Sequence, residues 1–170
     1  MTPFCQADIE SEEGFEAQAY PDPLSPLAAA CATAHLLNTH YRQLPAWRSY
    51  DGSPWTDGYG NASPGINADS TIDEPSAAAF VTQRVAGIAA RLVRALSWWP
   101  TLSDVRQDVL VNMAYELGVN GLLAFHQTLT YVAAGEYALA AVAMLQSKWA
   151  KQVPGRAKRL AQQMATGVRA

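Results

Sequence analysis

Two carboxylates near the start of the chain, Glu13 and Asp22, have the residue types and the spacing that cleavage of a glycosidic bond could use. That reaction needs one carboxyl group to donate a proton and a second carboxylate to hold the attacking water or act as nucleophile. Glu13 lies where a short helix is expected to end, and Asp22 lies in the proline-rich turn PDPLSP. Different surroundings can give two carboxylates different protonation states. The pair therefore favours glycoside hydrolysis, although any acidic helix followed by a turn would look the same.

Charge is unevenly distributed along the chain, whose net charge is −3. Six of the 15 acidic residues fall in residues 8–22, and six of the 12 basic residues fall in residues 148–170, where no acid occurs. A basic terminal segment can bind nucleic acid. Here the basic residues alternate with apolar ones at helical spacing, without interleaved aromatic side chains. We therefore expect no nucleic-acid partner, and instead a basic last helix that docks on an acidic first one.

The composition is that of a globular chain with a full hydrophobic core or two small lobes sharing one. Hydrophobic residues make up 49% of the 170 positions, and no apolar run approaches the roughly 20 residues of a membrane-spanning helix. We therefore expect no stable membrane insertion. The opening segment MTPFCQADIESEE has neither a basic nor an apolar region, so no signal peptide is predicted.

The cysteines and histidines predict no metal site. Cys5 and Cys31 permit one disulfide, worth about 3 kcal/mol in the chain-entropy model. Two buried thiols are the alternative, and the spacing leaves both possibilities open. Zinc-ligand spacing is absent among the cysteines and the three histidines, His35, His40 and His126. We expect no metal and no cofactor.

The first part of the chain predicts a mixture of short helices and strands. Gly14 is a helix stop signal that closes a helix over residues 3–13. The alternation in FEAQAY predicts a strand at residues 15–20, and WTDGYGN predicts a second short strand with a tight turn. Between them, the Ala- and Leu-rich residues 27–40 predict a helix.

The second part of the chain predicts helices only. Thr71 and Glu74 match a capping box at the start of a long amphipathic helix. Its predicted apolar stripe consists of Phe80, Val81, Val85, Ile88, Leu92, Val93 and Leu96. The next helix, VRQDVLVNMAYEL, is apolar on nearly all sides and is expected to be a core helix ended by Gly118.

Together these elements predict an α+β protein with a cleft between two lobes. We expect one domain over residues 1–170, with a small mixed N-terminal lobe, a long connecting helix and a helical C-terminal lobe. The expected bounds of these three parts are residues 1–70, 71–97 and 98–170.

The motifs resemble those of the phage-type lysozymes, glycoside hydrolase family 24. The family pattern has a Glu-Gly pair, an Asp separated from that Glu by eight residues, and then a strand of the form T-[IV]-G-[YI]-G-H. Glu13-Gly14 matches the first element, Asp22 the second, and Thr56 to Gly60 most of the third. The helical lobe adds three matches in the right order: NMAYELG at residues 112–118, FHQTL at 125–129, and Trp149 followed by PGRAKR at 154–159.

The resemblance implies a lysozyme-like fold and a role for each matched residue. Glu13 would be the general acid, and Asp22 and Thr56 would position the attacking water, so inversion at the anomeric carbon is implied. Two supporting ion pairs are implied, Arg156 with Glu13 and Arg159 with Glu12. Substrate contacts in the helical lobe would come from Glu116, Asn112, Phe125 and Thr128. For Glu116, capping or plain surface exposure is the alternative.

Three features depart from the family pattern. Residues 24–54 look like an insertion in the N-terminal lobe, a helix and a loop with Trp47 and Tyr50, which would add packing, roof the cleft or stack on sugars. Asp57 replaces an apolar residue, so we expect either a partner from the insertion or exposure to water. Asn61 replaces the usual His.

The resemblance implies a muramidase that cuts the β-1,4 bond between N-acetylmuramic acid and N-acetylglucosamine of peptidoglycan. The alternative is an inactive lysozyme-fold module that binds peptidoglycan or has a structural role; a lytic transglycosylase is disfavoured because that chemistry needs no water-holding Asp. Without a signal peptide, such a bacteriolytic enzyme would reach the periplasm or the cell wall through a holin, as an endolysin, or by dedicated secretion, as an antibacterial effector with an immunity protein. We expect a monomer.

Overall fold

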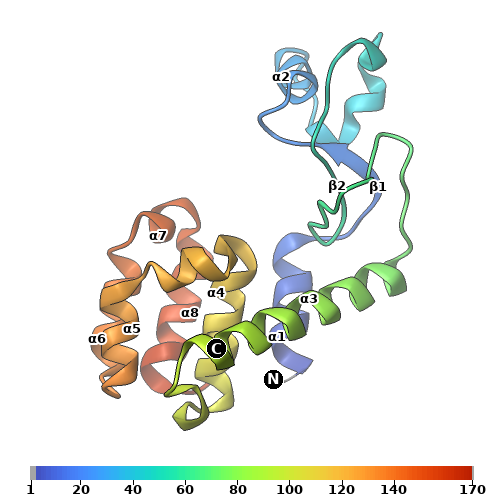
Figure 1. Ribbon diagram of the computed structural model, residues 1–170. Coiled ribbons are helices and arrows are strands. Elements are labelled where there is room, and N and C mark those ends of the chain that lie inside the picture. Colours follow the sequence, from blue (N-terminus) through green and yellow to red (C-terminus); the bar gives the residue numbers. More distant parts are fainter. Residues whose placement is uncertain (1–2, 170) are drawn as a thin grey trace. The chain divides into compact units, whose positions relative to one another are not determined.

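The computed structural model describes residues 3–169, which divide into two compact units (Figure 1). One unit is formed by residues 7–83, and the other by residues up to 6 and from 84 onward. The division falls inside two helices, α1 (Pro3–Glu13) and α3 (Glu74–Ala95). The protein is mostly helical with one small two-stranded sheet, so the predicted α+β class is confirmed.

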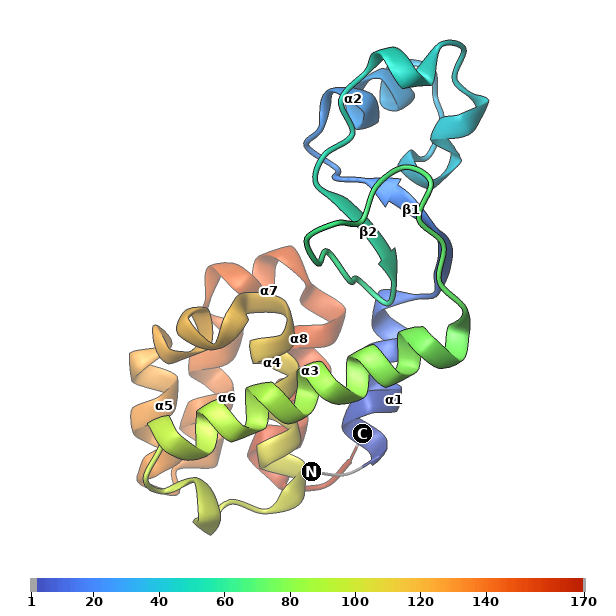
Figure 2. The same ribbon diagram turned by 45° about the vertical axis from the view of Figure 1, so that its right-hand side comes forward.

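The sheet of the 7–83 unit pairs β1 (Glu16–Pro21) with β2 (Trp55–Gly58) in antiparallel register (Figure 2). Tyr20 lies opposite Thr56, and Pro21 lies opposite Trp55. On the other edge of β1, the backbone N–H of Ala19 donates to the Ser70 carbonyl at 3.0 Å. Strand β1 is therefore held on both edges, and the two predicted strands are found with small shifts at their ends.

Residues 24–54 contain α2 (Pro26–Thr33) and two 3₁₀ helices, η1 (Asn38–Gln43) and η2 (Trp47–Ser49). The predicted helix over residues 27–40 is therefore wrong in its second half. Helix α2 ends because His35 takes a left-handed φ of 57° and the Leu36 N–H turns back to the Cys31 carbonyl at 2.9 Å. The segment has its own apolar cluster, in which Leu36, Leu44, Trp47 and Trp55 pack against the buried side chains of Leu27, Cys31 and Tyr41.

Helix α3 begins differently from the prediction. The Asp73 carboxylate accepts a hydrogen bond from the Ser76 N–H at 2.7 Å and so serves the capping role. The predicted capping box of Thr71 and Glu74 is wrong, because Thr71 forms a β-bridge with Gln18. Most of the predicted stripe is buried, but Val93 is 51% exposed.

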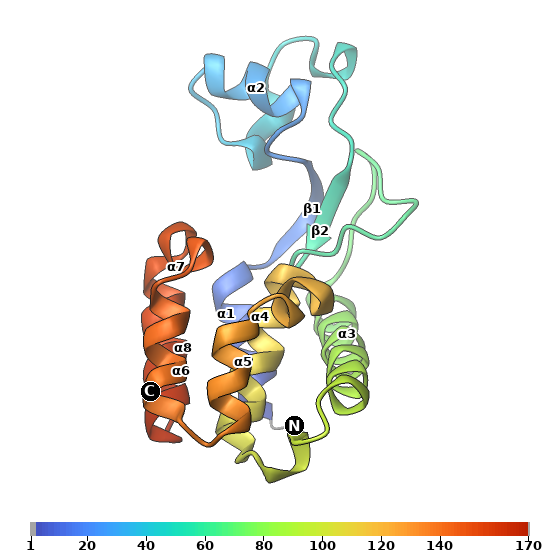
Figure 3. The same cartoon turned by 60° about the vertical axis from the view of Figure 1, so that its left-hand side comes forward.

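The other unit is a bundle of helices around α4 (Asp104–Leu123), following the short η3 (Trp99–Thr101). The predicted core helix is confirmed, since α4 is buried from Asp108 to Tyr115. Gly118 interrupts its helical conformation with a φ of 72°. Helix α8 (Pro154–Thr166) packs against α4 and α6 (Tyr137–Leu145) and against α7 (Lys148–Gln152), while α5 (His126–Ala133) packs on α6 (Figure 3).

Both cysteines are buried thiols, which is one of the two alternatives that the sequence left open. The Cys5 thiol points to the Asp108 carbonyl oxygen, 3.7 Å away, whereas Cys31 belongs to the apolar cluster of the other unit. Within residues 3–169, no helix is both long enough and apolar enough to span a bilayer.

Candidate functional site

Glu13 is positioned by the end of α1 and by the turn after β2. Helix α1 ends at Glu13 because Gly14 takes a φ of 70° and its N–H donates to the Glu10 carbonyl at 3.1 Å. A Cβ atom built at Gly60 would lie 3.4 Å from Glu13 Oε2. The glycine, whose φ is 77°, therefore serves both the turn and the close approach of the Glu13 carboxyl group.

Tyr20 also belongs to this site, although no sequence motif indicates it. It lies opposite Thr56 in the sheet. Burial raises the pKa of the Tyr20 phenol, and the negative charges of Glu13, Glu16 and Asp57 raise it further. The phenol is therefore a neutral hydrogen-bond donor at physiological pH. The strand alternation contained the signal, because it places Tyr20 on the face opposite the buried Ala19.

Asp22 is held by hydrogen bonds from both ends of the 24–54 segment. Its backbone N–H is shared between the carbonyls of Gly52 and Pro54, at 3.1 and 2.9 Å. Its Oδ1 accepts from the Leu24 N–H at 2.7 Å. Among residues 3–169 no backbone N–H donates to Oδ2, so this oxygen is suited to orient a water. Asp22 and Thr56 are half-buried and Glu13 is exposed, so each can be reached from solvent.

A substitution at Gly52 would test how the 24–54 segment holds Asp22. A Cβ at this residue would lie 2.5 Å from the Trp55 ring, which is packed edge-on against Tyr41. We expect Gly52→Ala to lower the free energy of unfolding by about 1–3 kcal/mol through overpacking. The shifted Gly52 carbonyl should then also lose its bond to the Asp22 N–H.

Urea unfolding measures the loss of stability. Gly87→Ala is the matched control, because Gly87 lies in α3 with nothing within 4 Å of the added Cβ. That change should stabilise the protein by about 0.5–1 kcal/mol. Equal stability of wild type and Gly52→Ala would show that the Trp55 ring can move aside without cost.

Asp57 in β2 and Asn61 after the turn that follows β2, the two residues that depart from the family pattern, are partners of each other. Asn61 Nδ2 donates to Asp57 Oδ1 at 2.9 Å, and the two backbones exchange hydrogen bonds at 2.8 and 2.9 Å. Both residues are buried, at 5% and 9% exposure. We expected either a partner from the insertion or exposure of Asp57 to water, and neither is found. The partner, Asn61, comes instead from the residues just after β2.

The Asp57 carboxylate predicts a dependence of stability on pH. Burial raises the pKa of Asp57, and the hydrogen bond from Asn61 lowers it in part. A raised pKa means that the folded protein binds the proton more tightly than the unfolded chain does. The free energy of unfolding from this group is therefore highest in acid and falls as the pH rises through the folded pKa.

We expect Asp57→Asn to be more stable than wild type at pH 7, with the difference shrinking toward about pH 4. Asparagine removes the buried charge but can still accept from Asn61. Urea unfolding across this pH range measures the effect. Asp73→Asn should have the opposite sign, because the hydrogen bonds from Ser76 lower the pKa of Asp73. A pH-independent difference for Asp57→Asn would contradict the assignment.

In the helical unit, Glu116 collects two hydrogen bonds on one oxygen. Its Oε2 accepts from Trp149 Nε1 at 2.9 Å and from Arg156 at 3.0 Å. The Arg156 side chain is only 13% exposed and that of Glu116 27%, so this is a partly buried ion pair. Arg159 follows on α8 three residues later. The pairs of Arg156 with Glu13 and of Arg159 with Glu12 stay predictions.

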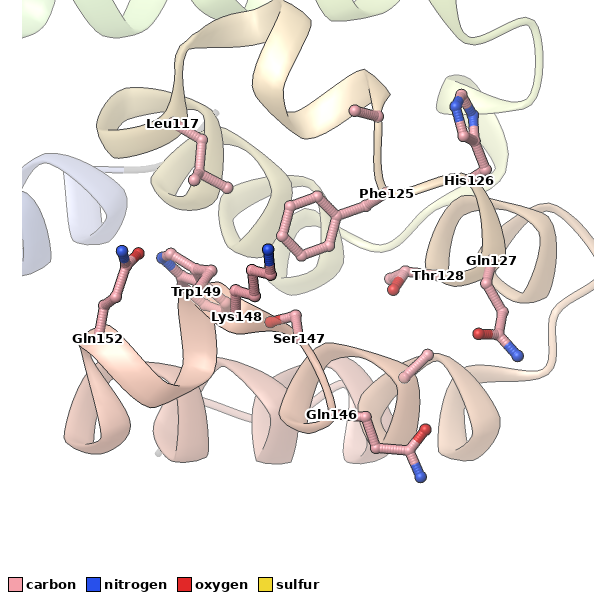
Figure 4. Close-up of a pocket in the computed structure, with 12 residues that line it drawn as sticks. Leu117, Phe125, His126, Gln127, Thr128, Gln146, Ser147, Lys148, Trp149 and Gln152 are labelled. Atoms are coloured by element: carbon pink, nitrogen blue, oxygen red, sulfur yellow. The ribbon is translucent and has the colours of Figure 1, made fainter.

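A groove of about 650 Å³ lies beside this pair (Figure 4). The Phe125 ring projects into it near Lys148 and Trp149 (Figure 4), and the Phe125 and Trp149 ring centroids are 6.3 Å apart in an edge-on arrangement. Thr128 also lines it but is only 2% exposed, and Asn112, not among its lining residues, is equally buried. The groove therefore combines two aromatic rings with several polar side chains, a mixture that a polar ligand such as a sugar could use.

Within residues 3–169, no group of three or more His, Cys, Asp or Glu side chains is arranged to hold a metal ion.

Comparison with known proteins places these residues in a wider context. A family model described as phage lysozyme matches residues 10–164. Over 69 residues the chain is 38% identical to the pre-baseplate central spike protein Gp5 of Enterobacteria phage T4, covering 41% of this chain and 12% of that protein. Over 69 residues it is 32% identical to probable T4-type lysozyme 1 of Dictyostelium discoideum, covering 41% of each. These matches span less than half the length of either relative.

Proposed function

The chain belongs to the phage lysozyme family, and on that premise we propose that it is a peptidoglycan muramidase. It hydrolyses the β-1,4 bond between N-acetylmuramic acid and N-acetylglucosamine. The observation that carries the proposal is the arrangement of residues around the sheet of β1 and β2. Thr56 lies opposite Tyr20, Asp22 follows one residue after the last strand pair, and the Glu13 carboxyl lies against Gly60.

In this proposal, Glu13 is the general acid that protonates the leaving glycosidic oxygen. Asp22 and Thr56 orient the water that attacks the opposite face of the sugar, which inverts the anomeric configuration. Asp22 suits this role because Oδ1 is fixed by Leu24 and Oδ2 is left to accept from water. The ion pairs of Arg156 with Glu13 and of Arg159 with Glu12 are part of the proposal as supporting contacts.

The glycan strand would bind along the helical unit through Glu116, Asn112, Phe125 and Thr128. Phe125 is suited to direct contact, because its ring borders the groove. The two buried side chains, Asn112 and Thr128, would act by fixing the groove wall rather than by extensive contact with sugar. Glu116 would orient the Trp149 indole and Arg156 toward the strand.

The proposed organisation is a single lysozyme-like domain over residues 1–170, acting as a monomer on the cell wall or in the periplasm. Delivery by holin-type release or by dedicated secretion, the latter with an immunity protein as a further partner, completes the proposal. Two rivals remain to be separated from it, a peptidoglycan-binding module without turnover and a lytic transglycosylase.

Digestion of purified peptidoglycan, with the products identified by mass spectrometry, tests the proposal. A muramidase releases fragments that end in reducing N-acetylmuramic acid. A transglycosylase instead releases 1,6-anhydro ends. Binding to the polymer without any release of fragments would support the module and overturn the hydrolase. NMR of the first products distinguishes inversion, which gives the α-anomer, from retention.

A further inference from the structure

The unit formed by residues 7–83 is strongly acidic except at one place. It contains 11 Asp and Glu residues and only two Lys or Arg residues, Arg42 and Arg48, which gives a formal net charge of −9. Both arginines belong to the 24–54 segment, which the family pattern lacks. Their positions therefore decide where this unit can attract a negatively charged group.

The two arginines converge on one aromatic ring. The guanidinium carbon of Arg42 lies 5.3 Å from the centroid of Trp47, and that of Arg48 lies 4.2 Å from it. Both guanidinium groups reach the same Asp69 oxygen at 3.4 Å. Two positive charges against one negative charge leave this surface, formed by Arg42, Trp47, Arg48 and Asp69, with a net charge of +1.

The two guanidinium groups differ in how far they are already engaged. Arg42 also donates to Tyr41 Oη at 3.0 Å and to the Ala68 carbonyl, so it ties the segment to the loop before Thr71. Arg48 has the long contact to Asp69 and the stack on Trp47, and its side chain is 65% exposed. Stacking holds the Arg48 fork in place while most of its donors face solvent.

We propose that this surface binds the carboxylates of the peptide stems of peptidoglycan, with Arg48 as the main contact. This inference rests on the proposed function for the choice of polymer. A guanidinium fork matches a carboxylate bidentately. An isolated carboxylate on an uncharged glycan can approach the single cationic place in an acidic unit.

Nucleic acid fits the same surface poorly. A row of phosphates needs a row of cations, and the nine excess negative charges of the unit would repel it. Stacked bases also need an open aromatic ring, whereas two guanidinium groups already lie within 5.3 Å of the Trp47 centroid. The chemistry therefore favours spaced carboxylates on a neutral backbone.

The surface formed by Arg42, Trp47, Arg48 and Asp69 is connected to Asp22 through the 24–54 segment of the same unit. The segment that carries Arg42 and Arg48 also supplies the Gly52 carbonyl to the Asp22 N–H and the Asn38 amide to the Pro21 carbonyl, at 3.1 Å each. Binding of a peptide stem here would thus fix the same substrate strand that the site acts on.

Co-sedimentation with purified sacculi tests the proposal, with all proteins carrying Glu13→Gln so that the polymer stays intact. Two polymers are compared, native sacculi and sacculi whose carboxyl groups have been amidated with carbodiimide and ammonia. We expect Arg48→Ala to bind native sacculi about threefold to tenfold more weakly at about 50 mM salt, with a smaller difference at about 500 mM. On amidated sacculi the two proteins should bind equally.

Arg94→Ala is the matched control, since it removes an exposed arginine outside the 7–83 unit and should bind like the parent. Arg48→Lys keeps the charge without the planar fork and should fall between the parent and Arg48→Ala. Thermal unfolding confirms that each variant is folded. Equal binding of Arg48→Ala and parent to native sacculi would overturn the inference, as would an equal loss on both polymers.

The two proposals can fail separately. Hydrolysis of peptidoglycan by the wild type, together with Arg48-independent binding, would remove the peptide-stem surface and leave the muramidase. Carboxylate-dependent binding through Arg48, without hydrolysis by the wild type, would do the reverse and support a binding module.

Discussion

Glu13→Gln is expected to lower the rate of peptidoglycan hydrolysis about 10²- to 10⁴-fold, the usual contribution of a general acid. Glutamine has nearly the same shape as glutamic acid but cannot give up a proton to the leaving oxygen. The side chain should still fit against Gly60, because glutamine has nearly the same size as glutamic acid. Release of reducing ends from purified peptidoglycan, measured at several pH values, reports the loss.

Glu16→Gln is the matched control for this prediction. It is the same substitution three residues later, at the start of β1 opposite Gly58. Activity close to that of wild type is expected there. If Glu13→Gln kept most of the wild-type rate while Glu16→Gln lost it, the proton donor would have been assigned to the wrong carboxyl group.

Asp22→Asn is expected to lower the same rate about 10²- to 10³-fold with little change in stability. The amide oxygen of asparagine can still accept from the Leu24 N–H, so the turn that follows β1 should persist. What is lost is the negative charge that orients and activates water. A large fall in kcat with a nearly constant KM would identify an interaction that is made in the transition state.

Asp51→Asn provides a control within the same segment. Asp51 Oδ1 accepts from the Ser53 N–H at 2.9 Å, the same kind of turn at the other end of the insertion. Wild-type activity of Asp51→Asn, together with the loss in Asp22→Asn, would separate catalysis from turn geometry. Equal losses in both variants would instead mean that the turns matter and that Asp22 has no special part.

Several elements of the fold could be predicted because their signals are local. Gly14 ends α1 through a left-handed conformation that glycine adopts readily, and alternation places Ala19 inward in β1. The middle of α4 is buried from Asp108 to Tyr115 because six of these eight residues are apolar. The helix expected over residues 27–40 failed for the opposite reason, since nothing in its composition announces the left-handed turn at His35.

Some residues of the candidate site could likewise be predicted from the sequence, and one could not. Glu13, Asp22 and Thr56 could be selected from residue type, spacing and the family pattern. In the structure Asp22 follows β1, Thr56 lies on its partner strand β2, and Glu13 at the end of α1 lies against the turn after β2. Tyr20 was missed because a strand tyrosine has no chemical signature until its neighbours are known. Its relation to Glu13 and Asp57 becomes visible only through the charges that raise its pKa.

The sequence by itself determined the family, the α+β class, the acidic start and basic end of the chain, and the order of the carboxylates that the proposed chemistry needs. These depend on residue type and on spacing over a few turns. Tertiary structure alone decided the partners: Asn61 for Asp57, Glu116 for Arg156 across 40 positions, and Asp69 with Trp47 for both cations of the acidic unit. Partners depend on which loops close on which strands. Where the groups are buried, as Asp57 and Asn61 are, the cost of an unpaired polar group then requires the hydrogen bond.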